Sequence, residues 1–290
     1  MAFDPMSFVI GQQAGKSGGS SGGGGSLPAG AYWKQIQPLV PVNKEHIFFV
    51  FNDVLYLCTK TSDGSGFAIY KFSDEKYTFV TQVTNTSLYP TDACELNGKV
   101  HLFVSNASYH YVFDGTTITK MSNLSGSPYS GDFFVFNGTI YASYLNDTYQ
   151  WNESSDTWTV SDLFPSGYKA ENKGIFLVHN NELYSIGDNI TSKQICKYEN
   201  QSMVKILDMP IYASGNTVSY EKGKVYYIHD VFSPTDIYCY DIESNTIQKV
   251  GSVPNPGGTP TRGYMYNGRY RLYGGSDEYR NHIELYEVTE

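Results

Sequence analysis

The chain has 290 residues, of which 16% are aromatic and 17% charged, and it contains 26 tyrosines. This composition supplies enough apolar surface for a substantial core and excludes wholesale disorder. The formal net charge of −9 at pH 7 opposes phosphate binding, so we expect no nucleic-acid partner. No run of about 18 apolar residues occurs, so we also expect no membrane span.

The first 30 residues differ in composition from the rest of the chain. In residues 1–16, an Asp-Pro pair at positions 4 and 5 favours a short helix that would expose apolar side chains. Residues 17–30 form a Gly/Ser-rich linker, which is typical of a flexible tether. We therefore expect an anchor segment that docks onto a larger body; an engineered tag and linker is the alternative. The anchor residues are Phe3, Met6, Phe8 and Ile10.

Residues 31–290 contain an internal repeat. Apolar and aromatic runs flank two-residue turns of Asn-Gly type that begin at residues 52, 97, 137, 180, 222 and 267. Because Asn-Gly between alternating runs is a strong hairpin signal, each turn predicts a pair of antiparallel strands. A second hairpin follows in each unit, so a unit holds four strands in about 43 residues, which is the length of a propeller blade.

The last repeat lacks its fourth strand. Its third strand is predicted at residues 282–286, near the end of the chain, whereas an unassigned strand stands at residues 32–36. We therefore predict an all-β fold, a six-bladed β-propeller of four-stranded antiparallel blades, in which the N-terminal strand completes the last blade and closes the ring. The positions that mark the fourth strands, all apolar or aromatic, are Trp33, Tyr77, Ile118, Trp158, Val204 and Ile247.

These repeats resemble the kelch family. A kelch blade carries two glycines after its second strand, followed by a tyrosine and a tryptophan. Leu272-Tyr273-Gly274-Gly275 matches the glycine pair, Ile186-Gly187 matches it in part, and Trp33 and Trp158 match the tryptophan. The resemblance covers about residues 31–290 and implies the fold, whereas function depends on sites built on the fold.

The longer loops of such a propeller lie on one face, around the central channel, and the short turns lie on the opposite face. Function usually resides on such loops, and tyrosine rings beside carboxylates suit a carbohydrate. The alternative is that these tyrosines pack between adjacent blades. The predicted ligand-binding residues on this loop face are Asp63, Tyr89, Asp92, Tyr129, Asp132, Tyr212, His229, Arg262 and Asp277.

Catalytic motifs are weak in this sequence, and we assign no catalytic residue, metal or cofactor. Kelch-like enzymes include copper radical oxidases and sialic acid mutarotases, but His101, His110 and His179 lie in or beside strands with no shared spacing. All four arginines fall between residues 262 and 280, so several blades cannot contribute arginines to a carboxylate site. The four cysteines, Cys58, Cys94, Cys196 and Cys239, lie in apolar runs without C-x-x-C spacing, so we expect reduced core residues.

The expected function is therefore that of a non-catalytic binding module. Residues 3–8 resemble the N-terminus of phage structural proteins, which implies a virion appendage of the tail- or head-fibre type that recognises a host surface glycan or protein. The anchor would then bind a virion or other scaffold protein. Because the N-terminus lacks a secretory signal, we expect assembly in the host cytoplasm. The alternatives are a kelch-type enzyme, such as a sugar mutarotase or oxidase, and an intracellular protein-interaction scaffold; the alternative location is the cytoplasm.

Overall fold

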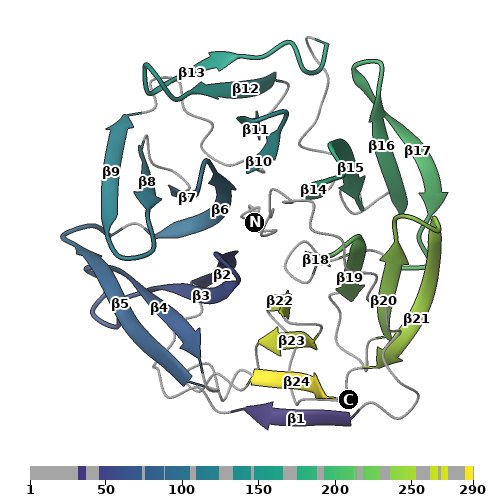
Figure 1. Cartoon of the computed structure of the whole chain (residues 1–290), viewed down its shortest axis with the longest axis horizontal. Helices are drawn as coiled ribbons and strands as arrows, with labels where there is room; N and C mark the ends of the chain where they lie inside the picture. Colours follow the sequence, from purple (N-terminus) through teal and green to yellow (C-terminus); the bar gives the residue numbers. More distant parts are fainter. Residues whose placement is uncertain are drawn as a thin grey trace, which may run out of the picture.

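The computed structural model describes residues 32–36, 46–73, 76–87, 89–104, 109–123, 133–144, 147–165, 175–187, 193–211, 213, 218–228, 236–252, 262–266, 269–273 and 285–289. Within these ranges the chain folds into strands that pair as six four-stranded antiparallel sheets. The sheets stand around a common centre, with β2, β6, β10, β14, β18 and β22 innermost and β1, β5, β9, β13, β17 and β21 outermost (Figure 1). This arrangement is a β-propeller.

Five sheets consist of four consecutive strands each, and we number these blades 1 to 5. Blade 1 holds β2 (His46–Phe51), β3 (Val54–Lys60), β4 (Gly66–Ser73) and β5 (Lys76–Thr84). Blade 2 holds β6 (Pro90–Leu96), β7 (Lys99–Val104), β8 (Tyr109–Phe113) and β9 (Ile118–Asn123). Blade 3 holds β10 (Phe133–Phe136), β11 (Thr139–Tyr144), β12 (Asp147–Asn152) and β13 (Thr157–Val160). Blade 4 holds β14 (Ile175–His179), β15 (Glu182–Ile186), β16 (Gln194–Glu199) and β17 (Ser202–Asp208). Blade 5 holds β18 (Ser219–Glu221), β19 (Lys224–Ile228), β20 (Asp236–Asp241) and β21 (Thr246–Ser252).

The remaining sheet is composite, because it joins the two ends of the chain. Its strands are β22 (Arg262–Tyr266), β23 (Arg269–Tyr273), β24 (Leu285–Thr289) and β1 (Tyr32–Ile36). Strand β1 pairs antiparallel with β24, from Tyr32 opposite Thr289 to Ile36 opposite Leu285. The last strand was predicted at residues 282–286, and the structure places it at Leu285–Thr289.

The two-residue turns follow from residues that tolerate a left-handed backbone. In blades 1 to 5, both central residues of the first hairpin have positive φ, as hairpin turns that match the strand twist require. Asparagine and glycine reach this region at low cost, which is why they recur at these positions. The turn residues are Asn52 and Asp53, Asn97 and Gly98, Asn137 and Gly138, Asn180 and Asn181, and Lys222 and Gly223. The predicted positions of these five turns are confirmed.

The outer strands begin near the predicted marker residues, with one correction. Tyr77 pairs with Phe72, Ile118 with Phe113, Trp158 with Trp151, and Ile247 with Tyr240. In blade 4 the equivalent residue is Met203, which is buried and pairs with Tyr198, whereas the predicted Val204 is 43% exposed. Strand alternation explains the difference, because a shift of one residue turns a side chain to the opposite face of the sheet.

Aromatic side chains fill the spaces between neighbouring blades. Phe103 of blade 2 stacks on Phe133 of blade 3 with ring centroids 3.7 Å apart, and Phe134 of blade 3 stacks on Phe176 of blade 4 at 4.6 Å. On the composite sheet, Tyr264 stacks on Phe48 of blade 1 at 4.2 Å. Burial of large aromatic rings between sheets removes apolar surface from water and so stabilises the ring of blades.

The prediction of an all-β propeller made of four-stranded antiparallel blades is confirmed. Cys58, Cys94, Cys196 and Cys239 are buried and free, as expected. Among the described residues, no helix is long and apolar enough to cross a membrane. The anchor residues Phe3, Met6, Phe8 and Ile10 and the linker at residues 17–30 lie outside the described residues.

Candidate functional site

The described part of the chain includes four of the predicted ligand-binding residues. Asp63 lies in the loop between β3 and β4, Tyr89 lies just before β6, and Asp92 lies within β6. Arg262 is described by its backbone, as the first residue of β22 rather than a residue of the preceding loop. The other predicted residues, Tyr129, Asp132, Tyr212, His229 and Asp277, lie outside the described residues.

Asp63 organises the β3–β4 loop of blade 1, on the predicted loop face. Its Oδ1 accepts hydrogen bonds from the Thr61 hydroxyl at 2.7 Å and the Ser65 backbone N–H at 3.0 Å. Its Oδ2 accepts one from the Ser65 hydroxyl at 2.7 Å. These bonds, led by the one from the Ser65 N–H, lower the pKa of Asp63 to about 2. The side chain is an exposed carboxylate held in one orientation.

The loop that follows β5 lies directly beside the β3–β4 loop. The backbone N–H of Thr86 donates to the carbonyl of Ser65 at 2.9 Å, which joins the two loops. The Lys60 ammonium lies over the ring of Tyr89, 5.3 Å from its centroid, in a cation–π contact. Tyr89 is partly buried against the core between blades 1 and 2. The structure thus brings Lys60, Asp63 and Tyr89 into one pair of neighbouring loops. One side of the Tyr89 ring packs against the core between blades 1 and 2.

Asp92 lies in the interior rather than in a loop. Its side chain is completely buried, its Oδ1 accepts a hydrogen bond from the Ala93 N–H at 2.8 Å, and its Oδ2 accepts one from the Phe133 N–H at 2.9 Å. Because Phe133 begins β10, the carboxylate connects the inner strands of blades 2 and 3. The loop predicted at residues 89–92 is corrected accordingly, since β6 already begins at Pro90.

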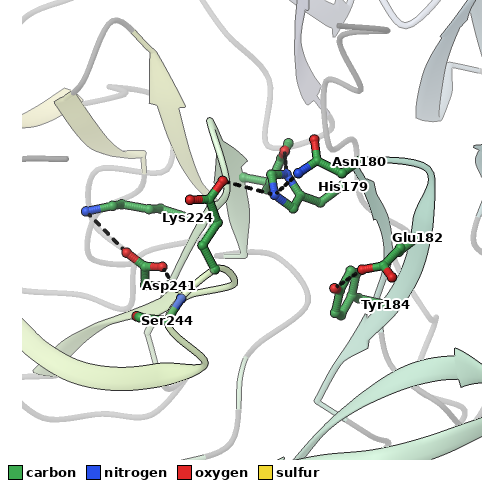
Figure 2. Close-up of polar contacts among 9 residues, drawn as sticks. His179, Asn180, Glu182, Tyr184, Lys224, Asp241 and Ser244 are labelled. Atoms are coloured by element: carbon green, nitrogen blue, oxygen red, sulfur yellow. Dashed lines mark hydrogen bonds and ion pairs between the residues drawn. The ribbon is translucent and has the colours of Figure 1, made fainter. Parts of the chain in front are cut away.

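The opposite face, formed by the tight turns, carries a polar cluster between blades 4 and 5 that the sequence did not single out (Figure 2). At the end of β14, the His179 Nδ1 lies 2.8 Å from the Tyr220 hydroxyl, and its Nε2 lies 3.0 Å from the Asn180 amide and 3.9 Å from a Glu243 oxygen. The sequence held one signal for this cluster, which is the residue type before the turn. In blade 4 that residue is a histidine, whereas in blades 1 to 3 it is the apolar Phe51, Leu96 or Phe136.

Two further polar pairs flank His179 on this face. Glu182 pairs with Lys197 at 2.6 Å, which is the first cause that lowers the pKa of Glu182. It also accepts a hydrogen bond from the Tyr184 hydroxyl at 2.7 Å (Figure 2). Burial, followed by the bond to Glu182, raises the pKa of Tyr184. On blade 5, Lys224 lies 3.7 Å from Asp241, whose pKa is lowered mainly by the Ser244 N–H. Each of these pairs lies within one blade, whereas His179 contacts Tyr220 and Glu243 of blade 5 across the interface.

Among the described residues, no group of three or more His, Cys, Asp or Glu side chains is placed to hold a metal ion. The ionisable side chains of the predicted site instead contact their own chain. Asp63 is stabilised as a carboxylate, and Asp92 accepts two backbone hydrogen bonds. In the described part of the chain, these two carboxylates therefore act as hydrogen-bond acceptors for their own chain.

Solved structures share the fold of this chain at low sequence identity. "Structure of YjhT" matches with a TM-score of 0.60 and 10% identity, over 87% of this chain and 95% of that one. "Crystal structure of the tricorn protease" matches with a TM-score of 0.54 and 13% identity, over 86% of this chain and 26% of that one, so the chain spans about a quarter of that protein's length. No family model matches the sequence, and no curated protein matches it. At these identities, the two structures support the propeller fold alone.

Proposed function

We propose that the chain is a non-catalytic binding module, a virion appendage of the tail- or head-fibre type whose loop face recognises a glycan or protein on the host surface. A rigid ring that presents loops on one face is a suitable scaffold for recognition. The proposal extends from the loops of blade 1, where the geometry is described, to the predicted loop-face residues of the other blades.

The observation that carries the proposal is the state of Asp63. Three short hydrogen bonds fix this exposed carboxylate and lower its pKa to about 2, so it remains ionised at neutral pH. An ionised and pre-oriented carboxylate accepts hydrogen bonds well, whereas a general acid or base works best with a pKa near the working pH. Asp63 therefore suits the binding of sugar hydroxyls or of N–H donors on a protein.

The neighbouring residues extend this surface. Lys60 adds a donor beside the acceptor Asp63, and Tyr89 adds an aromatic edge. A charged donor, an ionised acceptor and a ring within one loop pair are the groups that glycan and protein recognition commonly uses. Because Tyr89 is partly buried in the core, we assign it a supporting role beneath Lys60 rather than a stacking platform.

The proposal includes a six-bladed ring of kelch type, with the composite sheet as the sixth blade. Its support is the antiparallel register between β1 and β24, the packing of Tyr264 on Phe48 and the glycine pair at Gly274 and Gly275. Closure by the N-terminal strand would remove an exposed sheet edge, which otherwise invites aggregation. It would also fix the N-terminal tether to the outer rim of the ring.

Attachment to the virion is assigned to residues 1–30, on their sequence alone. An apolar anchor followed by a Gly/Ser linker would let the ring move about its attachment point. Deleting residues 1–26 should abolish incorporation into particles and leave the melting temperature of the purified chain unchanged. Particles that still incorporate the truncated chain would contradict the anchor.

The test of binding uses the full chain on a glycan array and on intact host cells, with a matched pair of variants. Asp63→Ala removes the loop-face carboxylate. Asp114→Ala removes an equally exposed carboxylate on the turn face, which also accepts hydrogen bonds from two following residues, Thr116 and Thr117. We expect binding to fall about tenfold for Asp63→Ala, the effect of losing one charged hydrogen bond, and to be unchanged for Asp114→Ala. No binding to either surface, equal effects of the two variants, or turnover of a bound sugar would refute the proposal.

A further inference from the structure

Two histidines lie side by side in the interface between blades 2 and 3. Cys94 of β6 pairs with His101 of β7, and Phe103 pairs with His110 of β8. Because side chains alternate along a strand, His101 and His110 lie on the same face of blade 2. Their ring centroids are 5.5 Å apart, with an angle of 27° between the rings.

Blade 3 covers both imidazoles with an indole. The ring of Trp151 lies 4.8 Å from that of His101 and 5.3 Å from that of His110. Phe103, beside the histidines on the same face of blade 2, stacks on Phe133, and its ring centroid lies 6.0 Å from that of Trp158. His101 is 2% exposed and His110 has no exposed surface, so the pair belongs to the packed joint between the blades.

Three of the four ring nitrogens in this joint lack an acceptor for an added proton. In the part of the chain that the structure describes, His101 Nδ1 and both ring nitrogens of His110 are buried without a hydrogen-bond partner. An imidazolium at His110 would be a buried charge without an acceptor, and one at His101 would have no acceptor at Nδ1, which is strongly unfavourable. Desolvation is the first cause that lowers the pKa of His101 to about 3 and that of His110 to about 4.

The charged groups around the pair do not offset that cost. Asp156, after β12, favours the charged form of both rings, but its Oδ1 already accepts a bond from the Trp151 indole N–H at 3.2 Å. Lys99 on β7 and the second imidazole both oppose a charge on His101. On β6, burial keeps Cys94 a neutral thiol. The Asp92 oxygens accept bonds from the N–H groups of Ala93 and Phe133.

We propose that the interface between blades 2 and 3 is an acid-sensitive joint, which stays packed while both imidazoles are neutral and opens when either one is protonated. Opening separates the indole of Trp151 from the two imidazoles and exposes them to water, where protonation is favourable. The joint would make the ring, and any ligand site that spans blades 2 and 3, sensitive to mild acid.

Tryptophan fluorescence follows this joint directly, because Trp151 and Trp158 are two of the three tryptophans of the chain. We expect the emission of the full-length protein to change reversibly as the pH falls from about 6.5 to about 4.5. The protection factors of the β7 and β8 amides, which correct for the pH dependence of intrinsic exchange, should fall at least tenfold over the same range, while those of β3 and β4 in blade 1 fall less. Uniform exchange across both blades would overturn a local joint.

Variants separate the pair from other histidines. The double variant His101→Phe with His110→Phe keeps two rings in the joint and removes both protonation sites, so its emission should be constant over this pH range. His46→Phe, at another buried histidine in blade 1, should retain the change. A double variant that responds to acid as the unaltered protein does would overturn the proposal. If the double variant fails to fold, ring NMR of the unaltered protein decides, since two histidines should stay neutral at about pH 6.5, where an ordinary histidine is half protonated, and six that titrate near 6.5 would overturn it.

Discussion

Replacing Asp92 tests whether this buried carboxylate connects blades 2 and 3. Asp92→Ala leaves the backbone N–H groups of Ala93 and Phe133 without their acceptor. Each hydrogen bond to a charged group contributes about 1.5–3 kcal/mol, and an unpaired buried donor adds its own desolvation cost. Removal of the buried charge recovers part of its desolvation energy. We therefore expect the free energy of unfolding to fall by about 3 kcal/mol, a large share of the 5–15 kcal/mol typical of a folded domain.

Urea unfolding followed by tryptophan fluorescence measures this loss, because Trp151 and Trp158 lie in the same interface. Asp92→Asn keeps one acceptor oxygen and should lose about half as much stability. Asp63→Ala, in an exposed loop, is the control and should shift the midpoint far less. A loss below about 1 kcal/mol for Asp92→Ala, or an equal loss for Asp63→Ala, would refute the connecting role.

Three further perturbations address the ring, a close approach of strands and the histidine pair. Deleting residues 1–36 removes β1 and should lower the melting temperature and promote aggregation. Deleting residues 1–31 keeps β1 and should leave the melting temperature unchanged. Equal melting temperatures for the two truncated chains would contradict closure of the ring by β1. Gly66→Ala places a Cβ against the carbonyl oxygen of Val83 and should destabilise the fold strongly. Gly98→Ala, in open space with a φ of 70°, should lower the free energy of unfolding by about 1 kcal/mol. Thermal melts compare the two variants, and a lower melting temperature for Gly98→Ala than for Gly66→Ala would contradict the close approach of β4 to β5. In the folded chain the pKa values of His101 and His110 are about 3 and about 4, whereas an ordinary histidine has a pKa of 6.5. At a pH between these values the unfolded chain binds more protons than the folded chain, so the free energy of unfolding falls as the pH decreases. Urea unfolding at several pH values should show a loss of about 3 kcal/mol between pH 6.5 and about pH 5, and a constant stability would contradict it.

The turns and strand order were predictable because they depend on local chemistry. Asn-Gly and related pairs adopt positive φ, and the resulting hairpins recur at a constant period, so the blades could be located from the turns alone. The strand at Tyr32–Ile36 was located in the same way, from its distance to the next turn. The error at Val204 arose because local chemistry does not decide this position. Met203 and Val204 are both apolar, and only the strand register decides which of them is buried.

The role of Asp92 in connecting blades 2 and 3 was not predicted, because a carboxylate just before an apolar run is typical of a loop residue. The spacing of Asp92 did indicate burial, since Asp92, Cys94 and Leu96 are two residues apart and therefore lie on the same buried face of β6. The partner of Asp92 is the N–H of Phe133, 41 positions away, which no local pattern specifies. The cluster around His179 was missed for the same reason, because Tyr220 and Glu243 reach it from another blade.

The most direct test of recognition by the loop face is a footprint of the bound ligand. Hydrogen exchange of the full chain is compared with and without the glycan or host protein that binds it. We predict slower exchange in the loops at residues 61–66 and 85–90, and unchanged exchange in the tight turns at residues 97–98 and 114–117. Protection confined to the tight turns would contradict a binding site on the loop face.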